Sequence, residues 1–62
     1  MLETYKEGDI IRIRWNESEF VVTVVAYLGT NFKGSIYLVK AEGDDFPSEI
    51  TDRNIIGLVK QG

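Results

Sequence analysis

Apolar residues in this chain fall in short runs separated by turns rich in glycine, asparagine and acidic residues, a pattern typical of β-strands. The densest run is 20–28, which holds β-branched and aromatic residues and no charge, glycine or proline. Such a run at a sheet edge would promote aggregation. We therefore expect 20–28 to form a long strand at the centre of a small sheet.

Neither face of this expected strand is polar. Side chains alternate along a strand, which places Phe20, Val22, Val24, Ala26 and Leu28 on one face and Val21, Thr23, Val25 and Tyr27 on the other. A strand in a one-sided sheet would alternate between apolar and polar residues, so we expect both faces to be at least partly covered. Either the strand bends and serves two orthogonal sheets of a small barrel, or a partner chain covers its second face.

The remaining apolar runs predict four further strands. Residues 10–15 have the pattern of a half-buried strand, with Ile11, Ile13 and Trp15 facing inward and Arg12 and Arg14 facing outward. The polar residues 16–19 then form a hairpin turn that leads into 20–28. The other expected elements are a hairpin loop at 29–34, a strand at 35–42, an acidic turn at 42–45, a short edge element at 46–51 that contains Pro47, a helical or 3₁₀ turn at 51–54 and a closing strand at 55–60.

This order of elements is typical of an all-β, SH3-like five-stranded barrel with a short 3₁₀ turn before its last strand. The competing OB-fold needs a longer chain and a helix between its third and fourth strands, and no stretch here has three turns of helical periodicity. The 62 residues contain no repeat or linker, so we expect one domain over 1–62.

Several short motifs resemble the Tudor-like group of SH3-like barrels over nearly the whole chain. They are Gly8-Asp9-x-Ile11-x-Ile13-x-Trp15, Phe20-x-x-x-Val24, and Asn54-Ile55 at the start of the last strand. The resemblance implies an aromatic cage at one end of the barrel that surrounds a methylated lysine or arginine through cation–π attraction. Trp15 and Phe20 match the first two cage positions, whereas the next two fall near Ala41 and Asp44. An alternative role for Trp15 and Phe20 is a cross-strand pair that caps the core.

The composition argues against catalysis and against metal binding. The chain has neither histidine nor cysteine, so it lacks an imidazole base, a thiolate nucleophile, disulfides and the usual ligands of structural zinc. We predict no enzymatic activity, no cofactor and no metal. The acidic segment 42–52 is interpreted as a hydrated rim, a weak cation site or a surface for a basic partner, and its acids lack the spacing of a calcium loop.

These features predict a non-enzymatic module that binds a protein or a cationic peptide segment through an aromatic and acidic rim. The candidate contact residues are Trp15, Phe20, Phe32, Asp44, Asp45 and Phe46. Phe32 has an alternative role as a hydrophobic plug over one end of the barrel.

Two other functions remain as alternatives. One is nucleic-acid binding through Arg12, Arg14 and Lys40, which the net charge of −3 disfavours because such proteins normally carry a basic footprint. The other is a structural role through self-association, and the sequence does not fix the oligomeric state.

The chain shows no sign of a membrane or secretory protein. It starts with charged residues rather than an apolar signal segment, and no run approaches the roughly 18 apolar residues of a membrane span. We therefore expect a cytoplasmic protein with no membrane partner.

Overall fold

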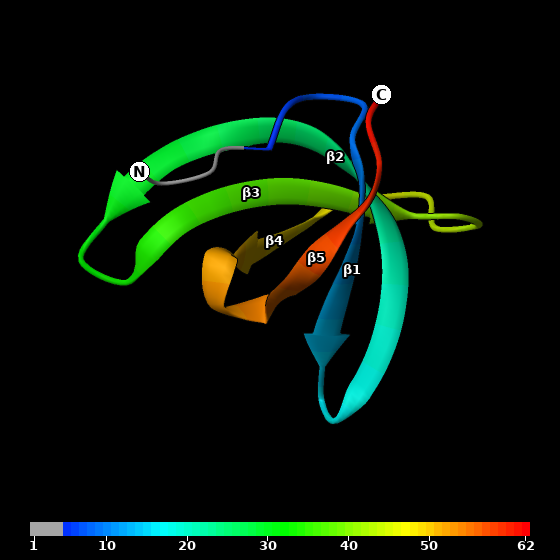
Figure 1. Ribbon diagram of the computed structural model, residues 1–62, viewed down its shortest axis with the longest axis horizontal. Helices are drawn as coiled ribbons and strands as arrows, with labels where there is room; N and C mark the ends of the chain where they lie inside the picture. Colours follow the sequence, from blue (N-terminus) through cyan, green and yellow to red (C-terminus); the bar gives the residue numbers. More distant parts are fainter. Residues whose placement is uncertain (1–4) are drawn as a thin grey trace.

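The computed structural model describes residues 5–62 and consists of five antiparallel strands and one short 3₁₀ helix (Figure 1). The strands are β1 (Ile10–Trp15), β2 (Ser18–Asn31), β3 (Gly34–Ala41), β4 (Ser48–Thr51) and β5 (Ile55–Lys60), with the 3₁₀ helix η1 (Asp52–Asn54) before β5. The predicted all-β class, the number of strands and the 3₁₀ turn before the last strand are confirmed. Residues 1–4 lie outside the described part of the chain.

β2 is the central strand, as predicted, because the strands lie in the order β4-β3-β2-β1-β5. It is longer than 20–28 because the glycine at position 29, which suggested a loop, instead sits in the strand with a φ of 118° beside a β-bulge. A second bulge lies between Val24 and Ala26. Bulges bend a strand and increase its twist, and Figure 1 shows β2 and β3 curving together.

The bend lets β2 serve two halves of the sheet. Residues 18–23 of β2 pair with β1, and residues 22–31 pair with β3. Within residues 5–62 no backbone ladder joins β4 to β5, so the hydrogen-bonded sheet is open between these two strands.

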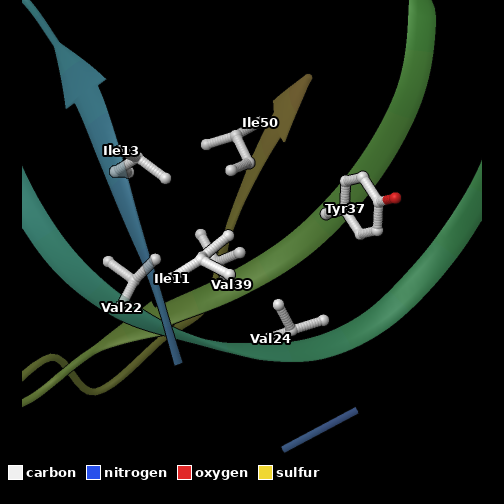
Figure 2. Close-up of a cluster of buried hydrophobic side chains, with 7 residues drawn as sticks. All are labelled: Ile11, Ile13, Val22, Val24, Tyr37, Val39 and Ile50. Atoms are coloured by element: carbon white, nitrogen blue, oxygen red, sulfur yellow. The ribbon is translucent and has the colours of Figure 1, made fainter. Parts of the chain in front are cut away.

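The core lies on the inner face of this curved sheet. Figure 2 shows its seven buried side chains, which come from four strands: Ile11, Ile13, Val22, Val24, Tyr37, Val39 and Ile50. They occupy alternate positions of β1, β2 and β3, as the period of a strand requires. Each buried aliphatic side chain contributes roughly 1.5–3 kcal/mol, so six of them together with Tyr37 make a small but continuous core.

The expectation that both faces of the central strand are covered holds only in part. Val21 and Thr23 are exposed on the outer face of the curved sheet, against which no second layer lies within residues 5–62. The bulge between Val24 and Ala26 then reverses the expected alternation, so that Tyr27 pairs with buried Tyr37 on the inner face and the two ring centroids lie 5.3 Å apart. Phe20 and Leu28, expected on the inner face, are about half exposed.

The first hairpin turn is shorter than the predicted 16–19. It consists of Asn16 and Glu17, both with positive φ (49° and 67°), and β2 already begins at Ser18. Two positive φ values define the two-residue turn whose twist matches that of the flanking strands. β4 is also shorter than the predicted 46–51, because Phe46 and Pro47 remain outside the ladder.

Asp9 fastens both ends of the chain to the sheet. Its buried carboxylate accepts hydrogen bonds from the backbone N–H of Lys6 (2.9 Å) and of Gly62 (3.0 Å). These hydrogen bonds, the one from Lys6 first, lower the pKa of Asp9 below its ordinary value. The backbone of Asp9 also accepts from the N–H of Val24 (2.8 Å), which extends the ladder between β1 and β2.

Candidate functional site

A groove of about 430 Å³ opens at one end of the sheet, between the β1–β2 hairpin, the end of β3 and β4. Its floor is formed by core residues, namely Ile13, Val22, Val39 and Ile50. The other lining residues are Trp15, Phe20, Ala41, Glu42, Asp44, Ser48 and Glu49. A ligand in the groove therefore reaches the hydrophobic core directly.

Two aromatic residues form one side of the groove. On β1 and β2, Ile13 pairs with Phe20 and Trp15 pairs with Ser18, so Trp15 and Phe20 lie diagonally across the two strands on the face of the core. Each is 46% exposed. They flank the opening, and about half of the surface of each residue is free to contact a ligand.

Acidic residues line the other side. β3 ends at Ala41, and the following turn is closed by a hydrogen bond from the N–H of Asp44 to the carbonyl of Ala41 (3.1 Å). This turn brings Glu42 and Asp44 to the groove. Glu49 on β4 also borders the groove, but its side chain lies on the outer face because it alternates with Ser48 and Ile50. The lining includes no lysine or arginine, so its formal charge favours cations.

The acidic residues do not form a metal site. Among residues 5–62, no three potential ligands from aspartate, glutamate, histidine or cysteine converge closely enough to hold an ion. Hard cations need several converging oxygens, which the acidic residues of the described part of the chain do not supply at one point.

The structure brings together three of the six predicted contact residues: Trp15, Phe20 and Asp44. Asp45 and Phe46 lie in the loop before β4, outside the groove lining, and Phe46 is 80% exposed. The interpretation of Phe32 as a plug is wrong, since it is 91% exposed. It belongs to the two-residue turn between β2 and β3, which extends past the end of the sheet.

Sequence reasoning missed several lining residues. Glu42 and Glu49 belong to the acidic segment that was recognised as a whole, but only strand pairing selects them from it. Ala41 was identified as a position where the Tudor-like cage carries an aromatic ring. Its small side chain leaves space at that point of the groove.

The three basic residues of the nucleic-acid alternative lie on the outer face of the sheet. Arg12 pairs with Val21, Arg14 with Glu19 and Lys40 with Thr23, and all three basic side chains are exposed. Because side chains alternate along β1, Trp15 lies on the opposite face from both arginines. The arginines therefore do not lie beside the ring of Trp15, on which a base could otherwise stack.

Known proteins give no further identification. In residues 5–62 no helix is long and apolar enough to cross a membrane. No protein-family model, curated protein or solved structure matches this chain significantly.

Proposed function

We propose that this protein is a non-enzymatic interaction module that binds a cationic peptide segment in the groove. The observation that carries the proposal is the composition of the groove: Trp15 and Phe20 on one side, Glu42 and Asp44 on the other, and the apolar core as its floor. A lysine or arginine side chain has both properties that this lining favours, since it combines an apolar stem with a charged head.

We further propose that the fold is a variant of the SH3-like barrel of the Tudor-like group. The shared, bent β2, the strand order β4-β3-β2-β1-β5 and the 3₁₀ turn before β5 are consistent with such a barrel, open between β4 and β5. Trp15 and Phe20 form the aromatic side of the groove. Where a complete cage would have two further aromatic rings, Ala41 leaves space and Asp44 supplies a negative charge. We infer a mixed aromatic and acidic receptor for a cation.

Both kinds of contact are of moderate strength. A cation over an exposed aromatic ring gains about 0.5–1 kcal/mol, and an exposed ion pair adds about 0–1 kcal/mol. Because the aromatic walls are half exposed, water screens both terms. We expect micromolar or weaker binding, roughly −8 kcal/mol or less in magnitude.

The test is an NMR titration with two peptides. One is a Gly-Ser peptide with a single Lys-Ser-Lys segment, and the other carries Gln-Ser-Gln in its place. The lysine peptide should shift the indole N–H of Trp15 and the amides of Phe20 and Asp44, and the glutamine peptide should not. Trp15→Ala and Asp44→Asn should weaken binding, while Arg12→Ala on the opposite face should leave it unchanged. Equal shifts with both peptides, or none with either, would reject the proposal.

Nucleic-acid binding is a second candidate, favoured by one observation. On β5, Lys60 pairs with Ile10, which pairs with Thr23, which pairs with Lys40. Lys60 and Lys40 therefore lie in one row across four strands on the face that also carries the two arginines. Binding of an oligonucleotide that falls steeply with salt and is lost in an Arg12→Ala, Arg14→Ala double variant would favour this candidate.

A further inference from the structure

We propose that the bound peptide also pairs with the free edge of β4, as a short antiparallel strand that exchanges two backbone hydrogen bonds with Glu49. This inference rests on the proposed function and adds how the peptide is held. β4 is an edge strand of the sheet, and three of its residues, Ser48, Glu49 and Ile50, line the groove. A peptide with a side chain in the groove thus lies next to this edge.

The pairing registers determine which backbone groups of β4 face the open edge. The backbone of Val24 faces the side of β1. Its N–H donates to the carbonyl of Asp9 and its carbonyl accepts from the N–H of Gly8 (both 2.8 Å). Val24 is therefore turned away from its partner on β3, Val39. In an antiparallel ladder such a pair does not exchange hydrogen bonds, so the backbone of Val39 is turned toward β4.

The same alternation continues across β3 to β4. Val39 pairs with Ser48 and Tyr37 pairs with Ile50, so Ser48 and Ile50 exchange hydrogen bonds with β3. Along a strand, the backbone N–H and carbonyl groups of successive residues point to opposite sides. Those of Glu49 and of Thr51 consequently face the open edge.

Thr51 gives an independent check of this direction. Its N–H donates to the side-chain Oδ1 of Asn54 (3.1 Å) and not to β3. The carbonyl of Ala41 gives a second check, since it is turned away from β2 and accepts from Asp44 (3.1 Å). Both hydrogen bonds agree with the alternation derived from Val24.

This edge is closed on either side of Glu49. The outward N–H of Thr51 is already bonded to Asn54, and Pro47, two residues before Glu49, has no N–H to donate. Edge strands are commonly protected in these ways against unwanted pairing. Within residues 5–62 neither the N–H nor the carbonyl of Glu49 has a hydrogen-bond partner on the edge side, so one residue remains open for pairing.

Charge favours a basic peptide over a second copy of this chain as the occupant. Antiparallel pairing of two copies at this position would place Glu49 opposite Glu49, and like charges directly opposite are destabilising. In a bound peptide, the residue opposite Glu49 lies on the outer face beside its carboxylate. The residues before and after it point to the groove side, as Ser48 and Ile50 do. Because Glu42 and Asp44 line the groove, basic residues are favoured at these two flanking positions. The ligand is therefore an extended segment with basic residues at alternate positions.

The experiment uses backbone-modified versions of the Lys-Ser-Lys peptide, which keep every side chain. The serine between the lysines should lie opposite Glu49, and each lysine should reach the groove. N-methylation of that serine removes its donor and should weaken binding about five- to tenfold, the effect of losing one hydrogen bond. N-methylation of the glycines that flank the segment should have no effect. Binding of the unmodified peptide should also slow hydrogen exchange at the amide of Glu49.

A pair of protein variants tests the same contact from the other side. Glu49→Pro removes an N–H that makes no hydrogen bond within the sheet, and it should lower the affinity for the peptide to a similar degree. Glu49→Gln keeps the N–H, so binding to this variant should remain sensitive to methylation of the serine. If the unmodified peptide binds but methylation of the serine changes nothing and the amide of Glu49 exchanges as before, the strand pairing is wrong and the groove proposal stands. If the unmodified peptide does not bind, both proposals are overturned.

Discussion

At the scale of single residues, the buried carboxylate of Asp9 holds the first and last described segments of this small domain together. The first and last described segments of a small domain tend to fray unless they are tied down. Asp9 ties both, because its two oxygens accept from Lys6 and from Gly62. Gly62 approaches so closely that a Cβ built on it would lie 2.1 Å from the carbonyl oxygen of Gly8. This arrangement, which we call the Asp9 clasp and which consists of Asp9 with its hydrogen-bond donors Lys6 and Gly62, therefore requires glycine at position 62 as well as aspartate at position 9.

Replacing Asp9 by asparagine should lower stability at neutral pH and flatten its dependence on pH. The folded-state pKa of Asp9 is lowered, so its contribution is complete above the ordinary pKa near 3.8 and is lost as pH falls through the lowered value. Urea unfolding at pH 7 and at pH 3 measures the difference. Glu7→Gln, at an exposed position, is the control. An unchanged pH dependence in Asp9→Asn would contradict the role of the clasp.

At the scale of elements, the two-residue turn before β2 is held against the preference of one of its residues. Asn16 tolerates positive φ well, whereas Glu17, with a φ of 67°, does not. The flanking strands impose this geometry, since their register places Trp15 opposite Ser18 and Arg14 opposite Glu19. The turn stores a small amount of backbone strain that a glycine would relieve.

Glu17→Gly should therefore stabilise the protein by up to about 1 kcal/mol, despite the entropy that glycine loses on folding. Chemical denaturation measures the gain. Glu17→Ala removes the same charge and keeps the Cβ, so it should give no comparable gain. Equal stabilisation by both substitutions would mean that charge, and not the backbone, sets the effect.

The 3₁₀ helix η1 depends on Asn54 in two ways. Its Oδ1 accepts from the N–H (3.1 Å) and the hydroxyl (3.2 Å) of Thr51, and its Nδ2 donates to the carbonyl of Arg14 on β1 (3.1 Å). Asn54→Ala should cost about 1–2 kcal/mol in unfolding free energy, because it removes all three bonds. Asn54→Asp keeps an acceptor for Thr51 and loses the donor to Arg14, so it should fall between. Arg53→Ala, in the same turn and exposed, should change little.

The sequence was most informative about elements and least about how they meet. β1 and β5 have the predicted bounds because turn residues flank both runs. β2 was predicted too short, because a glycine in a bulge has the same sequence signal as a glycine in a loop. The alternation of side chains along a strand was enough to predict that Trp15 and Phe20 are contact residues. The role of Glu49 could not be predicted, because it depends on pairing across β2, β3 and β4, which local patterns do not specify.

At the scale of the whole molecule, a small core leaves much apolar surface uncovered. Among residues 5–62, ten large hydrophobic side chains are exposed, and three of them, Ile56, Leu58 and Val59, lie on the edge strand β5. Self-association would bury them, but two register shifts in the ladder between β1 and β5 make this edge irregular, which limits pairing between sheets. We expect sedimentation to give one monomer mass over a wide concentration range. A mass that rises with concentration would favour the structural alternative.

The charges are also segregated across the molecule. Four of the basic residues, Arg12, Arg14, Lys40 and Lys60, occupy outward-facing strand positions, while the acidic residues Glu42 and Asp44 line the groove. The net charge of −3 alone would attract any cation at long range. Local and overall charge make different predictions, which matched variants can separate.

Reversing two charges in the groove, Glu42→Lys with Asp44→Lys, should weaken the Lys-Ser-Lys peptide roughly ten- to hundredfold and allow a Glu-Ser-Glu peptide to bind. Glu7→Lys with Glu19→Lys changes the net charge by the same amount outside the groove lining. This control should lower the affinity only slightly, and by less in high salt, because distant exposed charges are screened. Isothermal titration of both double variants at two salt concentrations gives the comparison. Equal losses in the two variants would show that the peptide responds to overall charge, and the groove would then have no specific part in recognition.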